Sequence, residues 1–79
     1  MDSTSTTTTL NARRLVTLLT QDGNRPGEGL RQMALLHVFG TTHADEFRAA
    51  LHHAVQCGWL GVSDTEFVFL TKEGYSIVV

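Results

Sequence analysis

The chain has 79 residues, of which 42% are hydrophobic and 18% are charged, and its formal net charge at pH 7 is −2. This length allows one small domain, and the hydrophobic content is well above that of a disordered chain. The single cysteine excludes an internal disulfide. No hydrophobic run approaches the roughly 20 residues of a membrane-spanning helix, and the beginning of the chain has no secretory signal pattern. We therefore expect a soluble, cytoplasmic protein.

The charges are divided unequally along the chain. Residues 1–39 carry four arginines and three acidic residues, whereas residues 40–79 carry two basic residues and five acidic ones. A nucleic-acid-binding surface gains most of its affinity by neutralising phosphates with Lys and Arg. The net charge of the second half of the chain is therefore negative, whereas a phosphate-binding surface needs a positive charge.

The first 40 residues predict a tail and two helices. The Ser/Thr-rich residues 1–9 have nothing to bury and are expected to be disordered, which leaves 10–79 as the folded domain. A first helix is predicted over 10–20, and a loop rich in glycine follows over 22–29. Residues 30–39 predict a second helix that is buried on most of its circumference. The expected inward residues of these two helices are Ala12, Leu15, Leu18 and Leu19, then Leu30, Met33, Ala34, Val38 and either Leu36 or His37.

A third helix is predicted to begin at Thr42, whose hydroxyl would cap it, and to end at Gly58. Apolar residues at helical spacing give it an inward face, and polar residues lie on the other side. The expected inward residues are Phe47, Ala50, Leu51, Ala54 and Val55. The expected outward residues are His43, Asp45, Arg48, Ala49, His52 and Gln56.

Residues 60–62 and 66–70 predict two strands joined by a polar turn, so a β-hairpin should fold onto the helices. Val68 and Leu70 would share one face of the hairpin, and Phe67 and Phe69 would share the other. Because one small core cannot bury both faces, we expect one of the phenylalanines to contact a partner. The apolar C-terminal residues 75–79 should be packed or lie in an interface.

Two short segments resemble bacterial winged-helix regulators. Gly58-Trp59-Leu60 is similar to the step from recognition helix to wing, and Leu70-Thr71-Lys72-Glu73-Gly74 is similar to the end of the second wing strand. The resemblance covers about residues 30–75 and implies an α+β fold, in which a C-terminal β-hairpin wing follows a three-helix core. It also implies a DNA-facing surface, with the wing tip 63–66 near phosphates. That surface would consist of Thr42, His43, Ala44, Asp45, Arg48, Ala49 and His52.

The chemistry of that surface differs from the pattern of the family. Base recognition favours Arg, Lys, Asn and Gln, whereas the third helix offers Arg48 beside Asp45 and Glu46. The wing tip likewise carries two acidic residues, Asp64 and Glu66, where a DNA-binding wing usually carries Lys or Arg.

His53 and Cys57 are four residues apart on one helix, which is a spacing that zinc ligands use. A structural zinc site needs four ligands, and no second cysteine completes this one. The same pair lacks the oxyanion site and orienting group of a Cys–His nucleophile. We therefore expect no metal, no cofactor and no catalytic residue.

Two functional hypotheses follow. The first is a non-enzymatic binding module that contacts another protein or its own copy, such as a regulatory adaptor or a phage-type inhibitor of a nucleic-acid-handling complex. Its expected partner-binding residues are Thr42, His43, Asp45, Arg48, His52, Phe67 and Phe69. The alternative is a dimeric winged-helix transcription regulator, in which Arg13 and Arg14 contact the DNA backbone. Surface charge favours the first hypothesis, and the family resemblance favours the second.

Overall fold

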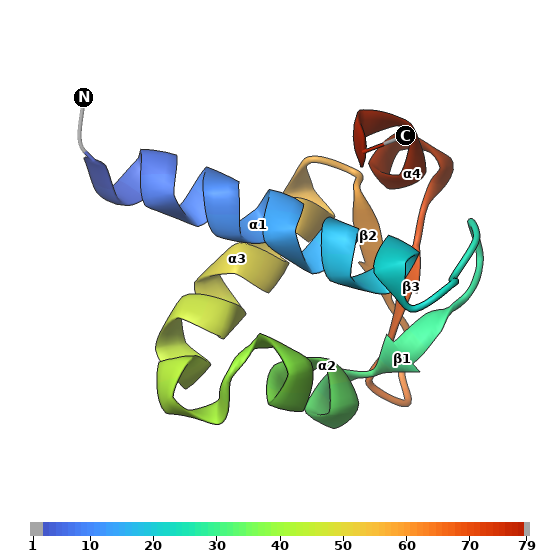
Figure 1. The fold of residues 1–79 in the computed structure, drawn as a ribbon, viewed down its shortest axis with the longest axis horizontal. Helices are drawn as coiled ribbons and strands as arrows, with labels where there is room; N and C mark the ends of the chain where they lie inside the picture. Colours follow the sequence, from blue (N-terminus) through green and yellow to red (C-terminus); the bar gives the residue numbers. More distant parts are fainter. Residues whose placement is uncertain (1–2, 79) are drawn as a thin grey trace.

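The computed structural model describes residues 3–78 and has an α+β fold with a three-stranded antiparallel sheet (Figure 1). The predicted fold class, a three-helix core with a C-terminal β-hairpin, is confirmed. A further strand and a further helix were not predicted from the sequence. The elements are α1 (Ser3–Gln21), β1 (Gly29–Arg31), α2 (Gln32–Phe39), the 3-10 turn η1 (Thr41–His43), α3 (Ala44–Gln56), β2 (Leu60–Val62), β3 (Phe67–Leu70) and α4 (Lys72–Val78).

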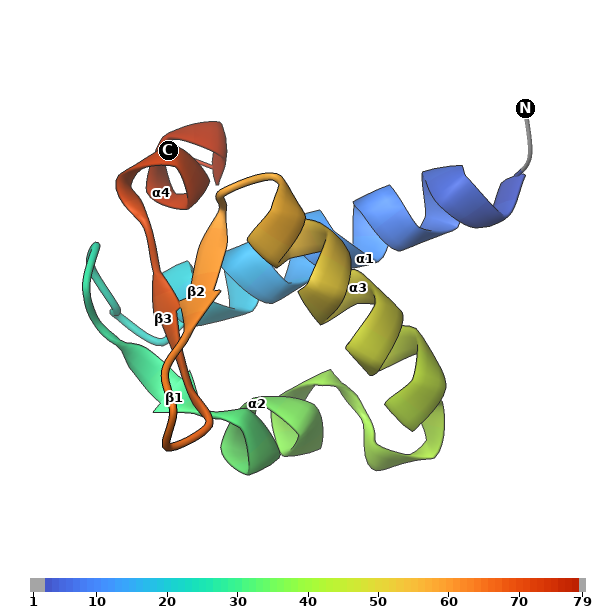
Figure 2. The same cartoon turned by 180° about the vertical axis from the view of Figure 1, so that it is seen from behind.

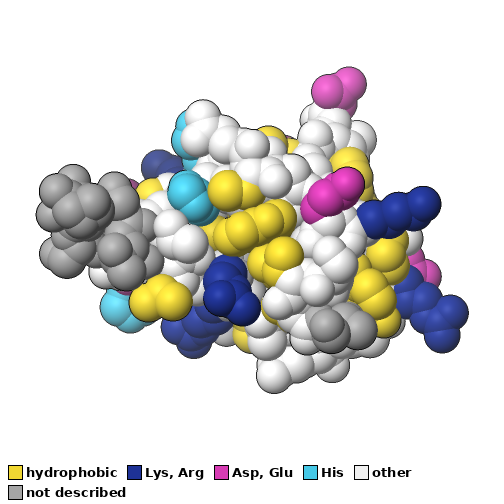
Figure 3. Space-filling view, turned by 90° about the horizontal axis from the view of Figure 1, so that it is seen from above, with side chains coloured by type: hydrophobic (Ala, Val, Ile, Leu, Met, Phe, Trp, Pro, Cys, Tyr) yellow, Lys and Arg dark blue, Asp and Glu magenta, His cyan; other side chains and the backbone are white. Residues whose placement is uncertain are grey.

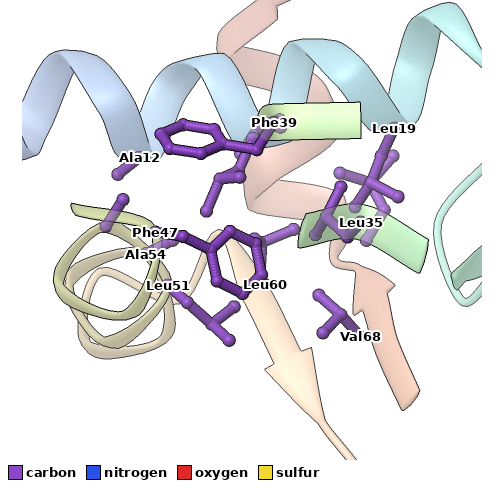
Figure 4. Close-up of a cluster of buried hydrophobic side chains, with 13 residues drawn as sticks. Ala12, Leu19, Leu35, Phe39, Phe47, Leu51, Ala54, Leu60 and Val68 are labelled. Carbon is purple, nitrogen blue, oxygen red and sulfur yellow. The ribbon is translucent and has the colours of Figure 1, made fainter. Parts of the chain in front are cut away.

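The elements surround a single core. α1 crosses α3, the sheet stands beside both helices, and α4 closes the end of the molecule above β2 and β3 (Figures 1 and 2). The core side chains come from α1, α2, α3, β2 and β3, and they gather between the helices and the sheet (Figure 4). Within the core, the ring centroids of Phe39 and Phe47 are 5.7 Å apart. No polar or charged residue among those described is buried, so burial of apolar surface is the main force that holds the fold.

α1 begins earlier than the hydrophobic pattern indicates, so the expected disordered tail is wrong for residues 3–9. The N-terminal part of α1 is held against α3, where Thr9 Oγ1 lies 3.2 Å from His53 Nε2. Further along α1, Leu18, which was expected to face inward, is only partly buried, and Val16 is buried. Met1 and Asp2 lie outside the described residues.

The predicted second helix is divided into β1 and α2. β3 pairs with β2 on one side and with β1 on the other, which places Leu30 opposite Val68. Hydrogen bonds from Gln32 N to Glu66 O and from Leu70 N to Glu28 O, each 2.8 Å long, flank this pair. The remaining helix α2 is short and buries only Leu35 and Phe39, one turn apart. Met33, Ala34 and Val38, which were expected to face inward, are exposed.

α3 begins at Ala44, two residues later than predicted, and the expected cap at Thr42 is wrong because no side chain caps this helix. The first turn is instead spanned by a side-chain contact in which His43 Nδ1 lies 2.9 Å from Glu46 Oε1. The expected inward face is otherwise confirmed, except that Val55 is 39% exposed. The buried residues of α3 are Phe47, Ala50, Leu51 and Ala54.

The β2–β3 hairpin has the predicted strands and alternation. Leu60 pairs with Leu70 and Gly61 with Phe69, so Leu60, Val68 and Leu70 face the core while Phe67 and Phe69 face away from it. The Phe69 ring occupies the space that a side chain at Gly61 would need, because a Cβ there would lie 2.3 Å from Phe69 Cζ. The half-buried Phe69 is thus explained by covering a glycine on the neighbouring strand.

The C-terminal segment forms α4 and packs against α1. Thr71 caps this helix, because Gly74 N donates a 3.0 Å hydrogen bond to Thr71 Oγ1. The Thr71 hydroxyl also lies 2.8 Å from Trp59 O. Gly74 is buried where a Cβ would lie 2.1 Å from Trp59 O. The sequence Leu70–Gly74 therefore joins β3 to α4 across the turn at Trp59.

Replacing Thr71 with Val removes the cap of α4 and its link to the Trp59 turn. We expect this change to lower the free energy of unfolding by about 1–2 kcal/mol. Thr42→Val is the matched control, because Thr42 is exposed and its side chain caps no helix; it should change stability by less than about 0.5 kcal/mol. Urea unfolding of both variants, followed by circular dichroism, measures the difference. Equal losses would contradict the assigned role of Thr71.

Candidate protein-binding groove

Exposed apolar side chains gather along one side of α3. Among the described side chains, the large hydrophobic residues that are exposed are Leu10, Met33, Val38, Val55 and Val62. Three of these five, Met33, Val55 and Val62, line a single groove that we call the α3 groove. Isolated exposed hydrophobic residues are normal on a protein surface, whereas a cluster in a concave surface indicates an interaction site.

The α3 groove consists of two adjoining hollows. The first, of about 250 Å³, lies between α2 and the beginning of α3 and is lined by Gln32, Met33, Leu36, Ala44, Phe47, Arg48 and Glu66. The second, of about 330 Å³, lies between the end of α3 and β2 and is lined by Gln32, Arg48, Leu51, His52, Val55 and Val62. Gln32 and Arg48 line both hollows and therefore stand at their junction. Each hollow is at or below the size of typical small-molecule pockets, which favours side chains of a partner as its occupants.

The local sequence explains why these side chains line the groove. Phe47, Ala50, Leu51 and Ala54 turn one side of α3 into the core. Arg48, His52 and Val55 follow at i, i+4 and i+7, so they form a separate stripe along the helix. Val62 ends β2 beside this stripe and is 41% exposed. The groove is therefore the boundary between α3 and the sheet.

The polar side chains of the α3 groove have no partners within the described part of the chain. Arg48 forms no ion pair with any residue among 3–78, and the side chains of Gln32 and His52 form no hydrogen bond there. Glu66 is the acidic residue that lines the groove. Arg48 and Gln32 together supply N–H donors at the junction of the two hollows. A partner that fills the groove must provide acceptors at this point.

The structure separates the residues that were predicted to form one partner-binding surface. Arg48 and His52 line the α3 groove, whereas Thr42, His43 and Asp45 line a different hollow at the beginning of α3. Phe67 and Phe69 lie on the sheet face opposite to Val62, because Val62 pairs directly with the buried Val68. The predicted set is therefore spread over three places on the molecule.

Only Arg48 and His52 of the groove were predicted as partner-binding residues, and the missed residues include Gln32, Met33, Val55 and Val62. Met33 and Val55 were assigned to the core because apolar residues on a helix usually face inward. The shift of the α2 start to Gln32, which follows from the pairing of β1 with β3, was not visible in the local pattern. Val62 could have been found, since its position at the end of a short strand beside a polar turn leaves it at the rim.

Arg13 and Arg14 are exposed on α1, which covers the inward face of α3. The guanidinium carbon of Arg14 lies 5.1 Å from the centre of the Phe39 ring, a cation–π contact. Neither residue lines the α3 groove. Arg14 thus has a contact with the core edge that accounts for its position.

The face formed by α1 and α4 carries a second group of hydrophobic side chains. Figure 3 shows them in the middle of this face, with basic, acidic and histidine side chains around them. Tyr75, Ile77 and Val78 of α4, and Trp59 before β2, are partly buried and pack against the core.

His53 contacts Cys57 at the end of α3 and Thr9 on α1. Cys57 Sγ lies 3.6 Å from His53 Nε2, the same nitrogen that lies near Thr9 Oγ1. The ring of His53 also meets Trp59 edge-on, with centroids 6.1 Å apart. No three potential metal ligands come together within the described residues. His53 therefore has a structural role between α1, α3 and the Trp59 turn.

No family model, curated protein or solved structure matches the chain. Among the described residues, no helix is both long and apolar enough to span a membrane. The assignment of the site therefore depends on the geometry of the α3 groove.

We expect His53→Ala to lower the free energy of unfolding by about 1–2 kcal/mol, because it removes the contacts with Thr9, Cys57 and Trp59. It should also speed amide hydrogen exchange in the first turns of α1. His52→Ala is the control, since His52 is exposed on the neighbouring position. Chemical denaturation and hydrogen-exchange mass spectrometry test this pair of variants. If His52→Ala changed amide hydrogen exchange in α1 as much as His53→Ala does, the proposed link between His53 and α1 would be refuted.

Proposed function

We propose that the protein is a non-enzymatic binding module that holds another protein, or a second copy of itself, in the α3 groove. The observation that carries this proposal is the clustering of Met33, Val55 and Val62 in one groove. Protein interfaces have an apolar centre and a polar rim. The α3 groove contains both kinds of surface: its two hollows include apolar side chains, and Arg48, Gln32, His52 and Glu66 supply polar groups.

The distribution of charge supports a protein partner over DNA. The β2–β3 turn carries Asp64 and Glu66, both exposed, at the place where a wing would approach phosphates. Asp45 and Glu46 are exposed in the first turn of α3, and Glu46 is paired with His43. Repulsion between these carboxylates and phosphates opposes the contacts from which DNA binding gains most of its affinity.

An apolar groove and acidic surfaces fit a regulatory adaptor or a small inhibitor of a nucleic-acid-handling complex. Such a protein needs a stable small scaffold and one contact surface, and it needs no reaction centre. The contact surface would bind a partner through complementary shape and apolar contacts, without catalysing a reaction.

The alternative proposal is a dimeric DNA-binding regulator. The succession of three helices and a β-hairpin favours it, since the winged-helix resemblance of the sequence implies this order. Arg48 on α3 would then contact bases or phosphates, and Arg13 and Arg14 would contact the backbone from α1.

Val55→Asp should abolish capture of the native partner, because it places a charge in the apolar part of the α3 groove. Val38→Asp is the matched control: Val38 is also an exposed helical valine near a helix end, and it lies outside the groove. Quantitative affinity capture from the native host, together with analytical ultracentrifugation for self-association, compares the two variants with the unaltered protein. If Val55→Asp retained every partner and the same oligomeric state, the groove would not be the binding surface.

The protein should show no saturable binding to random duplex DNA at low salt. Fluorescence anisotropy with a labelled 20-base-pair duplex measures this, first at about 50 mM and then at about 200 mM salt. A DNA-binding protein that makes several phosphate contacts would lose affinity steeply across this range. Tight binding with such a salt dependence, weakened by replacing Arg13 and Arg14, would establish the alternative function.

A further inference from the structure

We infer that the α3 groove accepts an amphipathic helix of the partner that carries an acidic residue midway between two apolar anchors. This inference rests on the proposed protein-binding function and specifies the chemistry of the partner. It follows from the order of groups along the groove, which is apolar, then cationic, then apolar.

The spacing of the two hollows fits two anchors on one helix. Phe47 lines the first hollow and Val55 the second, and eight residues of α-helix separate them by roughly 12 Å. A partner helix that lies beside α3 places residues i and i+7 on the same side, roughly 10.5 Å apart. One anchor would contact Met33 and Leu36, and the other would contact Val55 and Val62.

The groups at the junction of the two hollows indicate which residue the partner helix should carry between its two anchors. Arg48 stands there without an ion-pair partner among the described residues. Covering its guanidinium with apolar atoms alone would remove water without replacing its hydrogen bonds, which is unfavourable. A carboxylate at i+3 or i+4 of the partner would accept two of the N–H groups, and Gln32 can donate a further one. Glu66 lines only the first hollow, so an acid is favoured at the junction and disfavoured beside Met33.

A helix fits the groove better than an added β-strand. Strand addition needs free main-chain groups along a sheet edge. β2 is an edge strand of only three residues, and Leu60 within it is 2% exposed. The edge therefore offers little beyond Val62, whereas the two hollows lie one after the other along α3.

A displayed library of 15-residue helical peptides tests the inference directly. The library keeps apolar residues at i and i+7 and varies the residues at i+3 and i+4. It is sorted on the full 79-residue chain and on two variants, Arg48→Glu and Arg13→Glu. Arg13 is the matched control, because it is an exposed arginine on a helix outside the groove. Circular dichroism and thermal unfolding verify that each variant is folded.

We expect the unaltered chain and Arg13→Glu to enrich Asp or Glu between the anchors, and Arg48→Glu to enrich Lys or Arg. Reversing the charge of the central residue in a selected peptide should change its affinity for the unaltered chain by about tenfold or more. Val55→Asp should abolish binding of the selected peptides, and Val38→Asp should retain it.

Two results would overturn the inference. The first is the absence of any enriched binder, and the second is binders that show no charge preference between the anchors. If such binders were still lost in Val55→Asp, the protein-binding function would stand and only the acidic partner would be wrong. If no peptide bound the groove and duplex DNA bound with steep salt dependence, the proposed function itself would fail.

Discussion

Burial of one face of α3 is the constraint on which the rest of the structure depends. Phe47, Ala50, Leu51 and Ala54 pack against α1 and the sheet, and this packing sets the rotation of α3 about its own axis. Once that rotation is fixed, the residues that remain outside are fixed as well. A domain of this size has only one core, so apolar residues outside it cannot be buried elsewhere in the same chain. The groove along α3 is the consequence.

The sequence allowed prediction of the features that local patterns determine. Strand alternation predicted the hairpin, helical spacing predicted most of the inward face of α3, and Gly58 predicted where this helix ends. β1 could not be predicted in this way, because it exists only through its pairing with β3, nearly 40 residues later in the chain. The start of α2 moved with it. The cap at Thr42 failed because η1 inserts a 3-10 turn before α3, which the capping pattern does not reveal.

In the candidate site, too, some residues could be predicted from local sequence patterns and others could not. Arg48 and His52 were identified from the sequence because helical spacing places them outward, and both line the groove. Met33 and Val55 were missed because an apolar residue on a helix is assigned to the core by default, and only the three-dimensional packing shows that the core is already full without them. Phe67 and Phe69 were predicted to belong to the same partner-binding surface as residues of α3, because all of them were expected to be exposed. Strand alternation separates them, since Val62 shares its face with Val68.

The central claim is that the outer side of α3 contacts protein rather than nucleic acid. Site-specific photo-cross-linking in the native host measures this most directly, with the cross-linking amino acid placed at Val62 on the groove and, as a control, at Val38. Val62 should give a discrete protein adduct that is resistant to nuclease, and Val38 should give none. Nuclease-sensitive adducts at Val62, or the same adducts at both positions, would contradict this account.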